Sequence, residues 1–569
     1  MKTKLTLGIF LLTLQLSPAV YAQAPAEGAP NPYGVATFEC AGLYWKTPLA
    51  GPGKVRYRQL HDGSWKPGLD MVYDAKRGEY RGSIIRLQPD TDYEVELSTD
   101  SAKTSLSLRT RNDHFPIGKR TILPAGGIDH TIRITTSGTP DAYHLVTVAE
   151  NQRSVMDLMN ASNHGLEIDA DYVIVSGVEI RNAAIHGIQI LKGRHDIVVE
   201  NCHITFWGRI GGPKSFGNFD GHGDSAIYAE FDTYNLTLQR NLLDNPRGGS
   251  NDWESGHPNG PNGISVLQSK GGNVIRYNDI VSTEDHGFLD GIGGAVNFSE
   301  VGNMNRDSDI YGNLVRSVWD DAIECEGANM NVRIWGNYLS HYFNGLSSAA
   351  TSVGPLYLFR NILAVSRSGH ANSLGGLMFK TGTNRGFGGG RRFMFHNTAV
   401  QPNGPFNVFS AFWDPSPSST TRNNVFDVPG NLGPPVDEAP FSDCDYDYFS
   451  GIAQFSAAEP HRINPDPPHH RGGLFASSQK LEFYPSARIS QVVQGRSTTS
   501  INGKEVLVNG MVEYVKNPLI DSGVILPGFN EDFKGEGPDV GAFEVGAPPL
   551  EFGRRAYCNY DEGLAPWEK

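Results

Sequence analysis

Short apolar phrases recur along the middle of this chain, and each contains an asparagine at a fixed place. The phrases at 310–315 and 334–339 are typical, and the gaps between successive asparagines range from 24 to 40 residues. A fixed phrase with gaps of variable length predicts stacked coils whose loops leave one side. Asparagine suits such a corner because it tolerates left-handed backbone and can hydrogen-bond to its equivalent in the next coil. The series comprises Asn201, Asn241, Asn278, Asn313, Asn337, Asn361 and Asn397.

A second set of short strands accompanies these phrases and alternates between apolar and polar residues. Its five-residue segments begin at 187, 226, 263, 295, 322, 345 and 376. The second and fourth residues are apolar or small and should point inward, whereas the third and fifth should point outward. No stretch shows sustained helical periodicity, so the whole pattern predicts an all-β chain.

Residues 23–115 have a different pattern and are expected to form a small β-sandwich before the solenoid. Val55 to Arg58 alternates like a strand, and the segment from Leu87 to Leu97 resembles the signature of fibronectin type III sandwiches. In that family the tyrosine of the signature, here Tyr93, closes a corner by bonding to upstream backbone. This part is expected to be accessory rather than catalytic.

The repeated phrases resemble the right-handed parallel β-helix of the pectate-lyase-like superfamily over roughly residues 120–450. That resemblance implies polysaccharide lyases, glycoside hydrolases and epimerases, together with some phage and adhesin proteins. We expect a catalytic β-helix at 116–450 and its continuation with a C-terminal cap at 451–569. Repeats of this kind indicate the fold, whereas the function depends on the site.

The beginning of the chain and its net charge narrow the possible partners. Residues 1–22 combine a basic start, a short apolar run and small residues before Gln23. This is typical of a secretory signal and too short for a membrane span, so we expect a secreted or periplasmic protein. The net charge of −14 argues against a nucleic-acid partner. A polysaccharide or oligosaccharide is the expected partner of a monomeric chain.

Acidic residues are densest in one coil, which follows Trp319. Neighbouring coils lie about 4.8 Å apart and alternate residues of a strand about 7 Å apart. The acids should therefore share one open flank with Asn297 of the previous coil. The expected catalytic residues are Asp320, Asp321, Glu324 and Glu326. The expected substrate-binding residues are Asp290, His286, His341, Tyr342, Trp319, Lys380, His222 and Glu230.

The leading hypothesis for this patch is acid/base hydrolysis of a glycosidic bond, which requires no cofactor. One carboxylic acid would protonate the leaving oxygen while one carboxylate activates water, and inverting enzymes hold the two groups roughly 6.5 to 9.5 Å apart. Crowding raises the pKa of one acid and keeps it protonated. Asp321 and Glu324 would be the acid and base, tuned by Glu326 and Asp320.

The alternative is a calcium-assisted polysaccharide lyase. Asn297, Glu324 and Glu326 resemble the metal site of lyases of the chondroitinase B type, which implies Ca²⁺ and β-elimination on a uronate polymer. The residues that carry the base and acid in that family are missing, and Lys380, Arg385, His341 or Tyr342 would have to replace them. A third possibility is a non-catalytic glycan-binding rod with a solvated acidic ladder.

Overall fold

The computed structural model describes most of the chain between residues 31 and 568. The described residues are 31–150, 152–209, 223–247, 253, 260–294, 296–366, 376–382, 386–401, 407–411, 418–427, 443–449, 519–558 and 565–568, together with six short strands between 475 and 515. The expected secretory signal at 1–22 lies outside them, so secretion stays a prediction. Within the described part, no helix has the length and apolar character needed to cross a bilayer.

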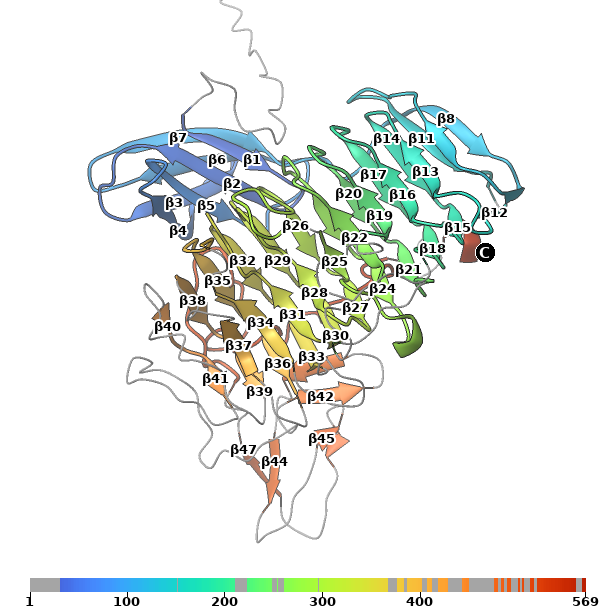
Figure 1. Cartoon of the computed structure of the whole chain (residues 1–569). Coiled ribbons are helices and arrows are strands. Elements are labelled where there is room, and N and C mark those ends of the chain that lie inside the picture. The colour runs from blue at the N-terminus through green and yellow to red at the C-terminus, as the bar shows by residue number, and fades with distance from the viewer. Residues whose placement is uncertain are drawn as a thin grey trace, which may run out of the picture.

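The coils stack on one another as the repeats predicted. Their strands form three long parallel sheets, and the whole is a parallel β-helix (Figure 1). The first ten coils each contribute one strand to each sheet in turn, and the described strands of the last two coils belong to two of the three sheets. Sheet 1 contains β10 (Ile132–Ile134), β13 (His164–Ile168), β16 (His186–Ile190), β19 (Ser225–Ala229), β22 (Asn262–Val266), β25 (Ile292–Gly293), β28 (Asp321–Glu324), β31 (Asn344–Ser347), β34 (Leu377–Thr381) and β37 (Asn407–Ala411).

The other two sheets have twelve strands each. Sheet 2 contains β8 (Ile117–Leu123), β11 (Tyr143–Val148), β14 (Val173–Ser176), β17 (Ile197–Glu200), β20 (Thr237–Gln239), β23 (Val274–Arg276), β26 (Asp309–Tyr311), β29 (Val332–Trp335), β32 (Leu356–Phe359), β35 (Arg392–Phe395), β38 (Ser419–Arg422) and β40 (Asp443–Cys444). Sheet 3 contains β9 (Gly126–Ile128), β12 (Ser154–Asp157), β15 (Glu179–Arg181), β18 (His203–Thr205), β21 (Leu242–Asp244), β24 (Asp279–Val281), β27 (Leu314–Arg316), β30 (Tyr338–Tyr342), β33 (Ile362–Ser366), β36 (Thr398–Val400), β39 (Val425–Asp427) and β41 (Tyr448–Phe449).

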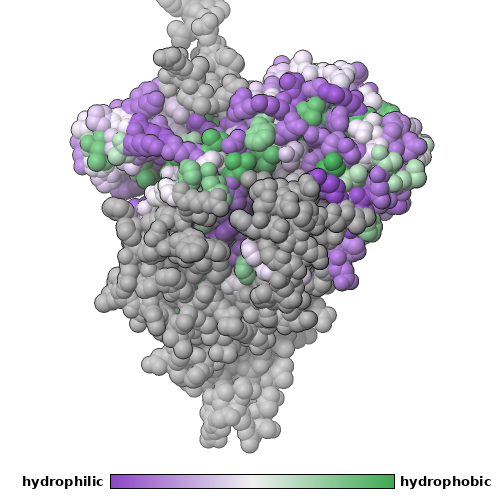
Figure 2. All heavy atoms as spheres, viewed as in Figure 1, coloured by the Kyte–Doolittle hydropathy of each residue, from purple (hydrophilic) through white to green (hydrophobic). Residues whose placement is uncertain are grey.

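The interior of the β-helix is a continuous aliphatic core, because the inward residues of the three sheets meet along its whole length. Ile264, Ile292 and Ile323 stack on successive strands of sheet 1 and are fully buried. Burial of this apolar surface is the main stabilising contribution to the rod. Where Figure 2 shows described residues over the first coils, their surface is mainly hydrophilic.

The asparagine series forms a hydrogen-bonded ladder at the corner between sheets 2 and 3. Nδ2 of Asn313 donates to Oδ1 of Asn337 over 3.0 Å, and Nδ2 of Asn337 donates to Oδ1 of Asn361 over 3.0 Å. The ladder ends at Asp447, which accepts the last amide. Asn201 is not part of it, contrary to our expectation. Its place is taken by the next residue, Cys202, whose N–H donates to Oδ1 of Asn241.

Seven antiparallel strands precede the β-helix, in the order β1-β2-β5-β4-β3-β6-β7. This sheet folds over on itself around its own apolar core, because β1 at one end also contacts β7 at the other. The strands are β1 (Tyr33–Ala36), β2 (Ala41–Lys46), β3 (Gly53–Gln59), β4 (Lys66–Asp74), β5 (Glu79–Ile84), β6 (Asp92–Ser98) and β7 (Lys103–Arg109). The Tyr93 hydroxyl accepts a hydrogen bond from the Gln88 N–H over 2.8 Å, which is the expected corner contact. Membership of the fibronectin type III family stays a prediction.

The antiparallel strands are docked on sheet 2 through buried polar contacts. Asp309 pairs with Arg333 over 2.6 Å and also accepts a hydrogen bond from Thr37. The Ser83 N–H donates to the Tyr357 hydroxyl over 3.0 Å. Both ends of each contact are buried, so the two parts are joined by satisfied, water-excluded interactions.

The C-terminal part departs from a simple continuation of the β-helix. Its early strands pair antiparallel, outside the three parallel sheets. They are β42 (Phe475–Ser478), β43 (Glu482–Pro485), β44 (Ile489–Val492), β45 (Ser500–Ile501), β46 (Lys504–Glu505) and β47 (Val512–Val515). Residues 519–558 and 565–568 lie along the ladder corner. Asn423 donates to the Val524 carbonyl, Asp279 pairs with Arg554 over 3.0 Å, and the Trp567 indole donates to the Asn201 carbonyl.

Candidate active site

The site lies on the outward side of sheet 1, around β28. Strand pairing places Glu324 directly beside Ser347 of β31, and Ser347 beside Lys380 of β34. On the preceding strand, the pairing of Ile292 with Ile323 puts Gly293 next to Glu324. A Cβ atom on Gly293 would lie 3.0 Å from Cβ of Glu324, so the glycine provides the space for this carboxyl group.

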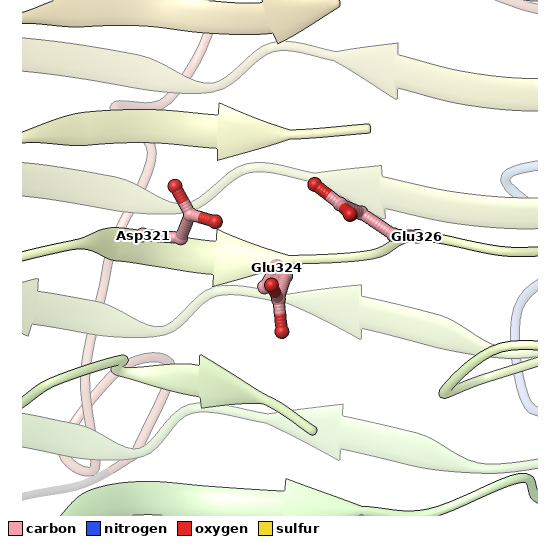
Figure 3. Close-up of side chains that lie close together, drawn as sticks. All are labelled: Asp321, Glu324 and Glu326. Carbon is pink, nitrogen blue, oxygen red and sulfur yellow. The ribbon is translucent and has the colours of Figure 1, made fainter. Parts of the chain in front are cut away.

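Three carboxyl groups of this coil lie close together. One oxygen each of Asp321, Glu324 and Glu326 lies within 4.8 Å of the others, so the three could hold a metal ion. Figure 3 shows Asp321 and Glu326 turned toward the later coils and Glu324 turned the other way. The separation is shorter than the roughly 6.5 to 9.5 Å expected of an inverting pair.

Two further aspartates join the cluster from neighbouring positions. Oδ1 of Asp290 accepts a hydrogen bond from the Asp321 N–H over 3.1 Å. Nδ2 of Asn344 donates to Asp321 over 2.7 Å and to Asp320 over 3.2 Å. We call Asp290, Asp320, Asp321, Glu324 and Glu326 the carboxylate cluster.

Lys380 brings a positive charge into the carboxylate cluster from two coils further along. Its Nζ lies 3.0 Å from Oδ2 of Asp321 and 3.1 Å from Oε1 of Glu326. Oε1 of Glu326 also accepts a hydrogen bond from the Ser347 hydroxyl. Glu324 has different partners, the amide of Asn297 at 2.6 Å and weaker donors on the preceding coil. Asp321 and Glu326 therefore have a cationic partner, whereas these partners of Glu324 are neutral.

Burial and crowding shift the acidity of these groups. The five acids are at most 6% exposed. Burial, reinforced by the Asp321 charge, raises the pKa of Asp290 to about 8. Burial and neighbouring carboxylates raise the pKa values of Asp320 and Glu324 well above normal, and burial raises that of Glu326. Although burial lowers it, the pKa of Lys380 is raised well above its usual value by Asp321 and Glu326.

The structure corrects three expectations about the arrangement. The carboxylate cluster is buried rather than spread on an open flank. Gly293, rather than Asn297, is in register with Glu324, and Asn297 reaches the site from the segment after β25. Met378 points into the core instead of outward, which leaves Lys380 in the same row as Glu324.

Other predicted substrate-binding residues do not reach the carboxylate cluster. Tyr342 is fully buried and its hydroxyl contacts Sδ of Met378, so this prediction is wrong. Trp319 is also buried, with its ring against Gly287, and offers little face to a sugar. His286 bonds to the Pro246 carbonyl, and no contact described for His286 links it to the cluster.

The remaining candidates lie further away or cannot be placed. His341 lies near the end of β30 and has a left-handed backbone there. Glu230 follows β19, three strands from β28, and accepts hydrogen bonds from Gln189 and the Lys192 N–H. His222 and Arg385 lie outside the described residues. Sequence reasoning did not propose Asn344, Ser347 or Gly293 as site residues. It placed Ser347 correctly beside Glu324, whereas Gly293 was hidden by the error in the register of β25.

Comparisons with known proteins give no family. No family model matches the chain and no curated protein matches it. Solved structures similar to it include a pectate lyase, with 14% identity over 77% of this chain and 91% of that chain and a TM-score of 0.39. The Family 28 exopolygalacturonase of Yersinia enterocolitica has 11% identity over 76% and 97%, with a TM-score of 0.25. The catalytic unit of an α-1,3-glucanase from Streptomyces thermodiastaticus has 11% identity over 75% and 89%, with a TM-score of 0.28. Similarity this low carries no conclusion beyond what the strand pairing shows.

Proposed function

We propose that this protein is a polysaccharide lyase that cleaves a uronate polymer by β-elimination. The carboxylate cluster would hold a Ca²⁺ ion, and Lys380 would be the base. The observation that carries this proposal is the ammonium group of Lys380 among five buried carboxyl groups. One ammonium group cannot balance five ionised carboxyl groups in a buried site, so several of these acids stay protonated unless a further cation joins them.

The residues present fit a calcium ion. Ca²⁺ prefers six to eight oxygen ligands, mainly carboxylates and carbonyls, and Asp321, Glu324 and Glu326 offer such oxygens within 4.8 Å of one another. Burial and neighbouring carboxylates raise the pKa values of Asp290, Asp320 and Glu324 and so favour their protonated forms, whereas a bound cation would favour the ionised forms that serve as ligands. When bound, the cation would neutralise the uronate carboxylate and acidify the proton on the adjacent ring carbon.

Lys380 would accept that proton through Nζ, a carbon–carbon double bond would form as the bond to the glycosidic oxygen breaks, and the leaving oxygen would take its proton from water. The side chain must be neutral to act as a base, whereas the charges of Asp321 and Glu326 now hold its pKa high. Balancing those charges with a cation lowers the pKa of Lys380, so cation binding and base activation are coupled. The Lys380 side chain is 14% exposed, whereas the acids around it are buried.

A panel of polysaccharides tests this proposal directly. Elimination creates an unsaturated product that absorbs in the near ultraviolet, and we expect this band from at least one uronate polymer. Chelation with EDTA should abolish it and added CaCl₂ should restore it. Reducing ends without the ultraviolet band, or activity unaffected by EDTA, would contradict the lyase.

Acid/base hydrolysis is the second candidate, favoured by the contrast between Glu324 and Asp321. Glu324 has a raised pKa and an amide partner, which suits a proton donor. Asp321 is paired with Lys380, which stabilises a carboxylate. A proton donor beside a carboxylate is the arrangement of an acid and a base or nucleophile. Reducing ends from a neutral polysaccharide, lost in Glu324→Gln, would support this candidate. A non-catalytic rod would bind glycans and release no fragments.

A further inference from the structure

Two arginines form a separate group near sheet 1, at the end where its strands begin. The Arg247 guanidinium donates through Nη2 to the carbonyl groups of Gly208 and Ala184. Its Nε and Nη1 atoms are buried, and neither has a hydrogen-bond partner among the described residues. Buried donors are rarely left unpaired in proteins, so these two atoms point to a missing acceptor.

Arg209 is held rigidly beside this group by one carboxylate. Its Nη2 lies 2.7 Å from Oδ1 of Asp224, and its backbone N–H donates to Oδ2 over 2.7 Å. Asp224 is fully buried, whereas 43% of the Arg209 side chain is exposed. The guanidinium is therefore oriented by Asp224 and still accessible to a ligand.

The arginines and the carboxylate cluster belong to the same face of the rod. Asp224 directly precedes β19, and its carbonyl accepts a hydrogen bond from the Asn262 N–H of β22. The side chain of Asn262 in turn accepts a hydrogen bond from the Asp290 N–H. Asp224 and Asp290 are thus two strand spacings apart, or about 10 Å. Asp224 pairs with Arg209 and is within electrostatic reach of Arg247, so two positive charges lie against one carboxylate about 10 Å along sheet 1 from the carboxylate cluster.

We propose that Arg209 and Arg247 form an anion subsite that binds the carboxylate of a uronate unit beside the unit being cleaved. This inference rests on the proposed function and specifies its substrate as a polymer with carboxylates on neighbouring units. A hydrogen bond from a guanidinium to a carboxylate is charge-assisted and stronger than a neutral one. Nε and Nη1 of Arg247 lie on different edges of its guanidinium, so each can donate one such bond, and Arg209 adds a fixed positive charge.

Steady-state kinetics on polygalacturonate and alginate test the subsite. Arg247→Met keeps the aliphatic stem and should raise KM roughly tenfold or more on the polymer that is cleaved, with kcat little changed. Arg209→Lys should give a smaller rise. The matched control is Arg316→Ala, an exposed arginine on β27 of sheet 3, which should leave KM unchanged. An unchanged KM in both subsite variants would overturn the subsite and leave the lyase proposal intact.

A binding measurement separates failure of the subsite from failure of the lyase proposal. If the wild-type protein forms no unsaturated product, the lyase is wrong, and affinity electrophoresis through gels containing polygalacturonate or alginate still tests the arginines. Retardation of the wild type that is lost in Arg247→Met and retained in Arg316→Ala supports the subsite. Equal migration of wild type and Arg247→Met in both gels overturns it. Arg209→Lys, which keeps the pair with Asp224, provides the second variant should Arg247→Met fail to fold.

Discussion

Nζ of Lys380 lies 3.0 Å from Oδ2 of Asp321, although 59 residues separate them in the chain. The stacking of three coils brings them together, since Asp321 is on β28 and Lys380 is on β34. Removing Lys380 therefore tests both the chemistry and the charge balance of the carboxylate cluster.

Lys380→Met should reduce kcat by roughly 10² to 10⁴, the usual contribution of a general base. The measurement is the rate at which the near-ultraviolet band of the unsaturated product appears. Lys270→Met, at an exposed lysine beside Tyr234, should leave the rate unchanged. Full activity in Lys380→Met would exclude this lysine as the base.

The pH dependence of stability should reveal the raised pKa of Asp290. Its pKa is about 8 in the folded chain, against about 3.9 when unfolded, so its favourable contribution is complete below about pH 4 and is lost as pH rises through 8. Asp290→Asn keeps an acceptor for the Asp321 N–H and cannot ionise. In EDTA, the free energy of unfolding of this variant relative to wild type should rise by a few kcal/mol between pH 5 and pH 8.5, on the order of the shift in pKa.

Urea unfolding at the two pH values measures this difference. Added CaCl₂ should reduce it, because a bound cation stabilises the ionised wild-type cluster. If the free energies of unfolding of wild type and Asp290→Asn differ by the same amount at both pH values, Asp290 does not titrate in this range.

Gly293→Ala should impair activity without unfolding the protein. The added Cβ would lie 3.0 Å from Cβ and 3.2 Å from Oε2 of Glu324, so this carboxyl group must shift. Misplacement of a catalytic or metal-binding group by about 1 Å can cost on the order of 10²-fold in rate. Gly127→Ala on β9 is the control, since its Cβ would meet nothing within 4 Å. Equal activity of the two variants would mean that the position of Glu324 is not critical.

Asn337→Ala should destabilise the rod by about 1 to 3 kcal/mol, because buried groups in two neighbouring coils lose their partners. Asn337 donates to Asn361 and accepts hydrogen bonds from the backbone and the side chain of Asn313. Thermal or urea unfolding measures the loss. Asn163→Ala, at an exposed asparagine outside the ladder, should change stability by less than about 0.5 kcal/mol.

The asparagine phrases predicted the stacked coils correctly because their spacing from the strands is fixed. The register of sheet 1 was harder to predict, because its strands contain no residue as distinctive as the asparagine of the other phrases. In the coil of β25 the paired strand is only Ile292–Gly293, too short for alternation to identify. We placed the segment at 295 instead of 291, which put Asn297 beside Glu324 in place of Gly293.

The same uncertainty in the register led us to place Lys380 in a different row of outward side chains from Glu324. The five-residue segment of β34 should be counted from Met378 rather than from Gly376. Met378 and Phe379 both face the core, and Lys380 is then the third residue, which points outward. A shift of this kind changes which side chains share a row. The burial of the carboxylate cluster depends on how the surrounding chain packs over sheet 1, which the local pattern of apolar and polar residues does not determine.

The asparagine ladder also allows the rod to change length in whole steps. Each amide makes the same two contacts, to the coil before and the coil after, whether 24 or 36 residues separate them. An insertion or deletion of one entire coil at a distance from β25, β28 and β34 would restore every rung and leave the chemistry untouched. Evolution could thereby lengthen or shorten the surface available to a polymer while preserving the centre that acts on it.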